Sequence, residues 1–388
     1  MRVIEYFRED RKFYAAVAAL IGTMVGVGIF AIPLAFSKAG FLVGFVFLVL
    51  MAGITLLLNL MYGEIILRTQ KDHQLVGYSE IYLGSIFRRL LFFPLALNSY
   101  IGILAYILLS GQFLNNIFSP LFYRTSDFYS IVFFIVFSLL LLLGIKRFSW
   151  VELILSGLFV TVILIIVSFS LPRIEWMNFI NFSSSSNYWF LPYGVLFFAF
   201  GGLSAVPIQR QILRGKEGKL RKAIIMAVAI TALLYLLFAL SVVGVAGDST
   251  SDNSINDLFM ILGEKMMVLC SLFGITAIGS AYLMLGAGFQ EVFNLDLGIK
   301  RIWAWALVVV PPFILFLGGM RNFVDIISLG GAVALGSESL ILLYIYVKAK
   351  NVGDRHPEYC LKLSRYFLYA MAVLFSVGIL LKLMLDAG

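Results

Sequence analysis

Residues 20–37 read Leu-Ile-Gly-Thr-Met-Val-Gly-Val-Gly-Ile-Phe-Ala-Ile-Pro-Leu-Ala-Phe-Ser. The stretch is as apolar as a helix inside a membrane, yet it contains Gly22, Gly26, Gly28 and Pro33. Glycine costs about 1 kcal/mol and proline about 3 kcal/mol in an ordinary helix interior. Non-helical backbone within a bilayer is tolerated only where it lines a cavity or is buried in protein. The stretch therefore predicts a membrane helix that is interrupted beside a cavity.

The composition of the whole chain indicates an all-α polytopic membrane protein. Of its 388 residues, 61% are hydrophobic and only 13% are charged, whereas soluble domains carry roughly 25% charged residues. We expect a single membrane domain over 1–388, without a cleaved signal peptide. Cys270 lies in an apolar run and Cys360 in a basic loop, which argues against a disulfide framework.

Hydropathy predicts eleven membrane spans, because about 20 apolar residues cross a bilayer. The first and sixth contain helix-breaking residues. The spans are 13–37, 40–67, 91–116, 128–145, 150–171, 190–213, 221–246, 265–289, 301–318, 324–347 and 363–385. Between the second and third spans, residues 77–86 predict a short amphipathic helix on the membrane surface.

The distribution of lysine and arginine predicts the orientation of these spans. If the N-terminus is cytoplasmic, 23 of the 29 lysines and arginines fall in cytoplasmic segments, which is the bias expected of membrane proteins. The C-terminus is then outside, and the expected location is the cell (inner) membrane. This distribution explains the net charge of +8, so the charge does not indicate a nucleic-acid partner.

An internal repeat relates the two halves of the chain. Gly28–Pro33 and Gly202–Pro207 both read G-x-x-A-[I/V]-P, and Gly202 follows Gly28 by 174 residues. The same offset carries three further spans of the first half onto spans of the second. Because each half holds five spans, the second enters the membrane from the opposite side. We therefore predict an inverted repeat of about 13–171 and 190–347, with 363–385 as an extra helix, a pattern typical of transporters.

The two broken stretches resemble those of the amino acid–polyamine–organocation superfamily. Gly26–Pro33 resembles its span 1 motif, and Phe198–Gln209 is similar to span 6 of its amino acid/auxin permease branch. The resemblance implies the leucine-transporter-type fold and a secondary active transporter, an ion-coupled symporter of amino acids, rather than an enzyme. It also implies alternating access and a monomer whose partners are an amino acid and the lipid bilayer.

The predicted substrate site lies at the two breaks. Unwinding at Gly26, Val27 and Gly28 would expose backbone N–H groups that suit a carboxylate, and the resemblance assigns the substrate carboxylate to this segment. Close packing of helices through small residues is the competing explanation for these glycines. The other predicted substrate-binding residues are Thr23 and Met24 before the first break, Phe200, Gly201, Gly202 and Ser204 at the second, and Tyr100 in the third span, where Tyr106 is a further hydroxyl.

The sequence is compatible with either Na⁺ or H⁺ as the coupling ion. The resemblance implies a sodium site formed by Gly22 and Val25 of span 1 with Thr276, Gly279 and Ser280 of span 8. The two hydroxyl residues of span 8 could instead bond back to their own helix. No lysine occurs in span 5, where some proton-coupled relatives place one. Apart from Na⁺ as a coupling ion, we expect no cofactor.

The alternative ion is a proton carried by Glu338, an acidic residue within the tenth span. Ionisable groups at such positions are costly and are often functional.

Acidic residues are absent from both breaks, which favours a neutral substrate. Two other functions stay open on the same fold: transport of another small organic solute or a metal ion, and a sensor that does not transport. The sequence contains no Walker motif, so ATP drive is not expected.

Overall fold

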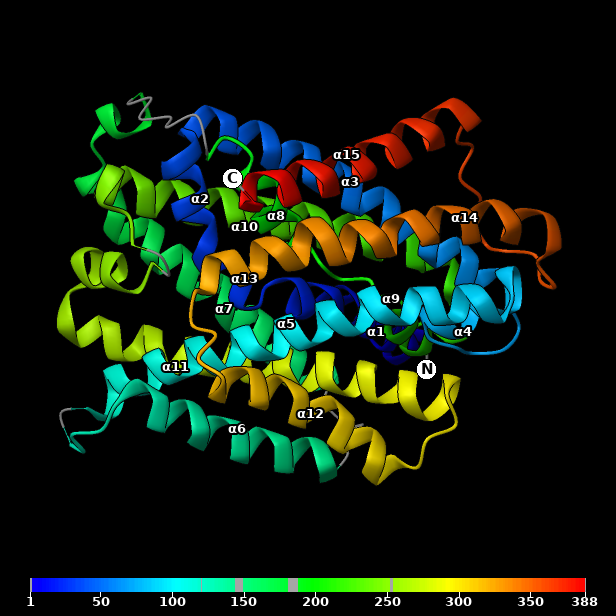
Figure 1. Ribbon diagram of the computed structural model, residues 1–388, viewed down its shortest axis with the longest axis horizontal. Helices are drawn as coiled ribbons and strands as arrows, with labels where there is room; N and C mark the ends of the chain where they lie inside the picture. The colour runs from blue at the N-terminus through cyan, green and yellow to red at the C-terminus, as the bar shows by residue number, and fades with distance from the viewer. Residues whose placement is uncertain (1, 120, 144–148, 181–187, 252–253, 388) are drawn as a thin grey trace.

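The structure is a computed structural model that describes residues 2–119, 121–143, 149–180, 188–251 and 254–387. Within these ranges the chain forms helices and short connections, and no strand occurs there. Most helices run along one common axis (Figure 1). We call the end of the bundle that holds the connections 68–74, 213–219 and 353–364 the basic end.

The first half begins with a broken helix. Helix α1 (Arg2–Met24) ends at the first break, and the chain continues as the 3₁₀ segment η1 (Val27–Ala31) and α2 (Ile32–Ala39). The remaining elements are α3 (Phe41–Leu67), α4 (Leu75–Leu83), α5 (Ser85–Phe118), α6 (Ser126–Leu143), α7 (Ser149–Ser170), η2 (Leu171–Arg173) and η3 (Trp176–Phe179).

The second half of the chain also starts with a broken helix. It begins with α8 (Leu191–Ala199) and α9 (Ala205–Ile212), separated by the second break. The other elements are η4 (Glu217–Lys219), α10 (Leu220–Ala246), η5 (Gly247–Ser249), α11 (Ile255–Glu291), η6 (Val292–Asp296), α12 (Arg301–Leu317), α13 (Phe323–Leu329), η7 (Gly330–Leu335) and α14 (Gly336–Val352), followed by α15 (Arg365–Ala387).

Each predicted span coincides with a helix or a broken pair of helices. Seven helices of the described chain are long and apolar enough to cross a membrane, and the α1–α2 pair, bent by 47°, makes an eighth. Helix α12 and the described part of α7 are shorter apolar helices. Residues 190–213 form the broken pair α8 and α9. The predicted all-α fold with two broken helices is thus confirmed.

The positions of the two breaks follow from the local sequence. Met24 ends α1 and Ala199 ends α8, and these residues are 175 positions apart (199 − 24), close to the offset of the sequence repeat. Pro33 stands in the first turn of α2, where proline is tolerated because the first N–H groups of a helix have no partner within that helix.

The helix after α3 differs from its prediction. It spans Leu75–Leu83 rather than 77–86, and it ends at Gly84, whose φ is 91°. Leu75–Ser79 are buried, and the helix packs against α5 and α14. The prediction of a membrane-surface helix was therefore wrong, because tertiary packing against two neighbours buries its first turns.

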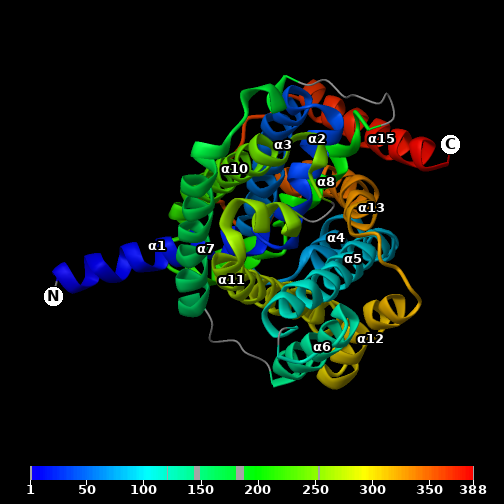
Figure 2. The ribbon, with the colours of Figure 1, turned by 90° about the vertical axis from the view of Figure 1, so that its left-hand side faces the viewer.

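The broken helices lie inside the bundle. Helix α1 packs against α7, α9 and α10, and α8 packs against α3, α13 and η7. Viewed along the bundle in Figure 2, α6 and α12 lie on one side and α15 on another. Helix α15 packs against α14 and η7. Both breaks are therefore enclosed by helices of the two repeats.

Candidate functional site

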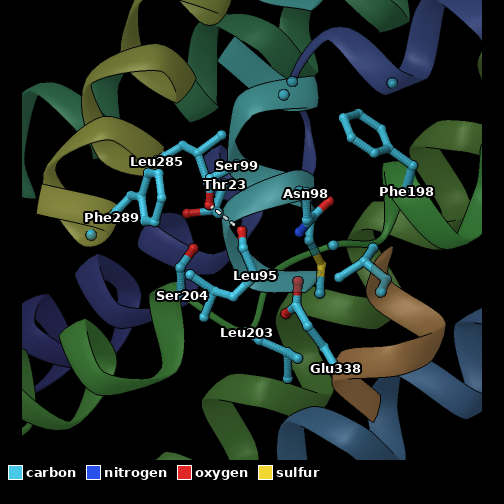
Figure 3. A pocket seen from close by; sticks show the side chains of 18 of the residues that line it. Thr23, Leu95, Asn98, Ser99, Phe198, Leu203, Ser204, Leu285, Phe289 and Glu338 are labelled. Carbon is cyan, nitrogen blue, oxygen red and sulfur yellow. Dashed lines mark hydrogen bonds between the residues drawn. The ribbon is translucent and has the colours of Figure 1, made fainter. Parts of the chain in front are cut away.

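A cavity lies between the two breaks, with walls from α5, α11 and α14 (Figure 3). It holds about 860 Å³ of space between atoms, part of which is open to solvent. The lining residues are Thr23, Met24, Gly26, Val27, Gly28, Tyr62, Gln74, Leu75, Leu95, Asn98, Ser99, Gly102, Tyr106, Phe198, Ala199, Gly201, Gly202, Leu203, Ser204, Leu285, Gly288, Phe289, Val292, Leu335 and Glu338.

The first break presents helix-start backbone to the cavity. Val27 and Gly28 are the first residues of η1, so their N–H groups have no acceptor in a preceding turn of that helix. A Cβ atom on Gly28 would lie 2.8 Å from the Cα atom of Ala199. Glycine at this position therefore allows the two breaks to come into direct contact.

The second break runs from Phe200 to Ser204. Its turns are closed by the Gly201 N–H, which donates to the Phe198 oxygen at 2.9 Å, and by the Ala205 N–H, which donates to the Gly202 oxygen at 3.0 Å. A Cβ atom on Gly202 would lie 2.7 Å from Leu20 Cδ1. The glycines thus serve close contact as well as unwinding.

One side chain connects both breaks. The buried hydroxyl of Tyr235, on α10, lies 2.6 Å from the Met24 oxygen and 2.7 Å from the Ala199 oxygen. These carbonyls end α1 and α8, where no N–H group of a following helical turn donates to them. The Met24 oxygen also accepts from the Gly26 N–H at 2.8 Å. Tyr235 therefore caps the two interrupted helices together.

Glu338 is the single acidic side chain among the cavity-lining residues, and none of these residues is basic. Its side chain points toward Asn98 of α5 (Figure 3), whose amide hydrogen-bonds the carboxyl group. The Oε1 atom of Glu338 has no hydrogen-bond partner in the described chain. Two other polar lining residues are turned to their own helices: Thr23 donates to the Ala19 oxygen and Ser99 to the Leu95 oxygen, both at 2.8 Å.

Most of the predicted substrate residues line this cavity. They are Thr23, Met24, Gly26, Val27, Gly28, Gly201, Gly202 and Ser204, together with the proton-coupling candidate Glu338.

Two predicted substrate residues lie outside the lining. Phe200 is fully buried behind the second break, with its ring 4.9 Å from that of Tyr235. The Tyr100 hydroxyl donates to the Leu307 oxygen of α12 at 3.0 Å. Phe198 lines the cavity in place of Phe200, because α8 continues to Ala199 and its last turn directs residue 198 to the cavity.

The residues predicted to bind sodium lie on α1 and α11, which contact each other. Val25 is buried in the α1 break, while Gly22 is half-buried. On α11 the three residues have different surroundings. A Cβ atom on Gly279 would meet the Phe137 ring of α6 at 2.3 Å, Ser280 is half-buried and Thr276 is exposed. The structure thus brings the two helices together but turns Gly279 toward α6.

Sequence reasoning missed several lining residues, notably Tyr62, Gln74, Asn98 and Phe289. Asn98 is an amide that directly follows the apolar run 91–97 of the span 91–116, and that polar residue is a signal that could have identified it. Gln74 precedes α4, and its side chain donates to Glu291 at 2.8 Å. Its position became apparent only from the packing of α4 into the bundle.

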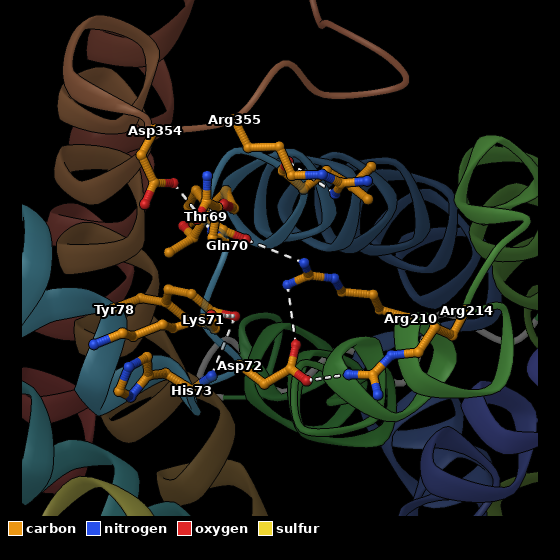
Figure 4. Close-up of polar contacts among 12 residues, drawn as sticks. Thr69, Gln70, Lys71, Asp72, His73, Tyr78, Arg210, Arg214, Asp354 and Arg355 are labelled. Carbon is orange, nitrogen blue, oxygen red and sulfur yellow. Dashed lines mark hydrogen bonds and ion pairs between the residues drawn. The ribbon is translucent and has the colours of Figure 1, made fainter.

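An ion-pair network lies at the basic end (Figure 4). The Asp72 carboxylate is 3.2 Å from Arg210 of α9 and 2.6 Å from Arg214. Arg210 also donates to the Thr69 oxygen at 3.1 Å. These contacts join the chain after α3 to the second half of the sixth span.

The connection 353–364 is fixed to the same region. The Gln70 N–H donates to Asp354 at 3.0 Å, and the Arg355 N–H donates to the Arg68 oxygen at 3.1 Å. Glu64, which is fully buried in α3, accepts from Arg68 at 2.9 Å and from the Leu361 N–H at 2.7 Å. The carboxylate of Glu64 thus anchors this connection to α3.

Tyr78 of α4 completes the polar contacts at this end. Burial raises the pKa of Tyr78 to about 12, so the phenol stays protonated at neutral pH. Its hydroxyl accepts from the His73 N–H at 3.3 Å and donates to the Lys71 oxygen at 3.4 Å. The turn 71–74 is therefore closed onto α4.

Comparisons with known proteins agree with this geometry. A tyrosine-specific transport system 1 from Haemophilus influenzae (strain ATCC 51907 / DSM 11121 / KW20 / Rd) is 26% identical over 369 residues, which cover 89% of this chain and 90% of that protein. Among solved structures, MhsT in complex with L-phenylalanine superposes with a TM-score of 0.70 at 13% identity, covering 96% of this chain and 98% of that one.

A second solved structure has the same fold. It is Mhp1, a nucleobase-cation-symport-1 family transporter in a closed conformation with bromovinylhydantoin bound, with a TM-score of 0.66 at 12% identity over 96% of this chain and 90% of that one. The tryptophan/tyrosine permease family matches residues 9–384, nearly the whole sequence. The chain therefore belongs to the tryptophan/tyrosine permease family.

Proposed function

We propose that the chain is a secondary active transporter that carries tyrosine or tryptophan across the cell membrane in symport with Na⁺ or H⁺. The observation that carries this proposal is the cavity between two helix breaks that contact each other at Gly28 and Ala199. Paired broken helices at a repeat interface are the usual location of a transporter's substrate site. The family and the name of the Haemophilus influenzae relative support an aromatic amino acid as the substrate.

The backbone supplies groups for the charged end of such a substrate. The N–H groups of Val27 and Gly28, at the start of η1, would donate to the α-carboxylate, since a helix N-terminus favours an anion. Carbonyl oxygens at the end of α1 would accept from the α-ammonium group. Neither contact requires a charged side chain, in agreement with the uncharged residues of both breaks.

Alternating access would close and open the two ends of the bundle in turn. The ion pairs of Asp72 with Arg210 and Arg214 support a state in which the basic end is closed. We place this end in the cytoplasm because its three connections belong to the segments that together hold 23 of the 29 lysines and arginines. The N-terminus is then cytoplasmic, the C-terminus is outside, and the transporter acts as a monomer.

Two coupling ions are compatible with this mechanism. Na⁺ would lie between α1 and α11, with Gly22, Val25 and Ser280 as the ligands best supported by the contact of these helices; Thr276 and Gly279 would need to turn toward it. A proton would be carried by Glu338.

Within the superfamily, we place the chain near the amino acid/auxin permease branch. The basis for this placement is the similarity of Phe198–Gln209 to span 6 of that branch.

Uptake by the purified full chain in proteoliposomes tests the proposal. Radiolabelled tyrosine, tryptophan and a panel of other amino acids are supplied first with a sodium gradient and then with a proton gradient. We expect accumulation of tyrosine or tryptophan above the equilibrium level under one gradient, and its collapse with an ionophore for that ion. Failure of both amino acids to accumulate under either gradient would contradict the proposal.

A further inference from the structure

Glu338 is a buried carboxyl group that the protein leaves partly without a partner. It lies in the first turn of α14 and is 3% exposed. Asn98 hydrogen-bonds the carboxyl group, while Oε1 has no partner in the described chain. A buried acceptor left without a hydrogen bond is unfavourable, so its retention calls for a ligand.

A second unpartnered polar atom lines the same cavity. The hydroxyl of Tyr62, on α3, is buried and has no hydrogen-bond partner among the described residues. Both Tyr62 and Glu338 contribute to the cavity wall. Two unpartnered polar atoms on residues of one cavity wall indicate a ligand that brings a polar group of its own.

The position of Glu338 separates it from the residues at the first break. Its partner Asn98 precedes Tyr106 by eight residues on α5, which corresponds to about 12 Å along the helix axis. Tyr106 lies beside the first break, where its hydroxyl would be 3.1 Å from a Cβ atom on Gly26. This separation matches an extended aromatic amino acid with a hydrogen bond at each end.

The wall of the cavity is suited to a ring. Leu95, Leu203, Leu285 and Phe289 all line it (Figure 3). An aromatic ring held among them would exclude water from the carboxyl group. A ring donor would give the buried carboxyl oxygen its hydrogen bond, whereas a ring without a donor would leave that oxygen unpaired.

We infer that Glu338 determines substrate specificity by accepting a hydrogen bond at Oε1 from the phenol O–H of tyrosine or the indole N–H of tryptophan. Phenylalanine has the same α-amino and α-carboxyl groups but no ring donor, so it leaves Oε1 without a partner. This inference rests on the proposed function and deepens it: the site takes aromatic amino acids that carry a ring hydrogen-bond donor.

Two other roles for Glu338 make different predictions. If it binds the α-ammonium group, its loss weakens tyrosine and phenylalanine equally, because both substrates carry that group. If it only carries the coupling proton, its loss changes accumulation and leaves the ratio of the two affinities unchanged. The ratio of the tyrosine affinity to the phenylalanine affinity therefore distinguishes the specificity role from the other two roles.

The test measures dissociation constants for tyrosine, tryptophan and phenylalanine with the purified full chain. In the unaltered protein we expect tyrosine to bind about 10- to 100-fold more tightly than phenylalanine, the range expected when a buried acceptor is left without its hydrogen bond. Glu338→Met keeps the side-chain length without an acceptor and should bring the two affinities to within about threefold. Phenylalanine affinity should stay nearly unchanged.

Two further variants control for the fold and the charge. Glu338→Gln keeps a neutral acceptor, so its preference for tyrosine should fall between that of the unaltered protein and that of Glu338→Met. If Glu338→Met fails to fold, Glu338→Gln provides the test. Glu80→Met removes a carboxylate outside the cavity lining and should keep the full preference.

The possible failures are distinguishable. If the unaltered protein binds tyrosine tightly but Glu338→Met and Glu338→Gln both keep the full preference, the inference is overturned and the proposed function stands. Equal weakening of tyrosine and phenylalanine in Glu338→Met also overturns it. If the unaltered protein binds none of the three amino acids, the proposed function fails together with the inference.

Discussion

The hydroxyl of Tyr235 lies 2.6 Å from the main-chain oxygen of Met24, the last residue of α1, and it lies 2.7 Å from that of Ala199, the last residue of α8. A phenol carries one proton, so it donates to one of the two carbonyls at a time. The three groups come from α1, α8 and α10, and the contact holds the two breaks in a fixed relation. Its loss should therefore disturb both halves of the site.

Replacement of Tyr235 by phenylalanine should impair both stability and transport. The change removes the hydroxyl that faces the Met24 and Ala199 oxygens. The Met24 oxygen keeps the Gly26 N–H, whereas the Ala199 oxygen loses its donor, and a buried acceptor without a partner costs about 1–3 kcal/mol. We expect a lower melting temperature and reduced tyrosine uptake in proteoliposomes. Tyr369→Phe, at an exposed position of α15, is the matched control and should behave as the unaltered protein does. Normal uptake by Tyr235→Phe would show that the contact is dispensable.

Addition of a methyl group at Gly28 should separate the two breaks. Its Cβ atom would lie 2.8 Å from the Ala199 Cα atom, and main chain cannot move aside as a flexible side chain can. Overpacking of this kind costs about 1–3 kcal/mol. We expect Gly28→Ala to lose substrate binding, measured by ligand-induced thermal stabilisation. Gly157→Ala is the control, because a Cβ atom there meets nothing within 4 Å; equal behaviour of the two variants would contradict the prediction.

The ion pairs at the basic end should contribute unequally to its closure. Arg210 is 11% exposed and also bonds the Thr69 oxygen, whereas Arg214 is 72% exposed. Exposed ion pairs contribute about 0–1 kcal/mol. We therefore expect Arg210→Gln to open this end more than Arg214→Gln does.

A cysteine at Ser204, on the cavity wall, reports the opening. In a background without Cys270 and Cys360, an impermeant thiol reagent added at the basic end should label it faster in Arg210→Gln than in Arg214→Gln. Equal labelling rates in both variants would argue against a special role for Arg210.

Two glutamate–arginine pairs of similar length should differ strongly in their contribution to stability. Glu64 is fully buried beside Arg68 at 2.9 Å, while Glu80 and Arg88, 2.8 Å apart, are both partly exposed. Removal of one partner of a buried pair costs about 3–5 kcal/mol, and Glu64 also holds the Leu361 N–H. Glu64→Gln should lower the melting temperature by several degrees, whereas Glu80→Gln should change it little. A similar melting temperature for both variants would refute this assignment.

Substitutions at Ser280 and Glu338 should distinguish the coupling ions. If Na⁺ lies between α1 and α11, Ser280→Ala should abolish sodium-driven uptake of tyrosine, while Glu338→Gln should retain a sodium response. If the proton is the coupling ion, Glu338→Gln should lose proton-driven accumulation and Ser280→Ala should keep it. Measuring tyrosine uptake under each gradient for both variants tests these two expectations. Unchanged sodium-driven uptake by Ser280→Ala would remove Ser280 from the sodium site.

The sequence by itself determined the spans and the two breaks, because these features depend on local chemistry. A run of apolar residues long enough to cross a bilayer is visible without tertiary information, and Gly26, Gly28 and Gly202 mark where helix is disfavoured. The recurrence of the motif at Gly28–Pro33 and Gly202–Pro207 indicated the repeat. Most of the break residues named from the sequence line the cavity between the breaks.

Only the tertiary structure decided which side chains face the cavity. Phe198 lines it and Phe200 packs behind the break on Tyr235, although both are phenylalanines within three residues of one another. Their directions depend on where α8 ends and on what packs against it. Likewise Asn98 meets Glu338 through the packing of α5 beside α14, and no local pattern relates residues so far apart. Hydropathy specifies what enters the membrane, whereas helix rotation and packing specify the chemistry of the site.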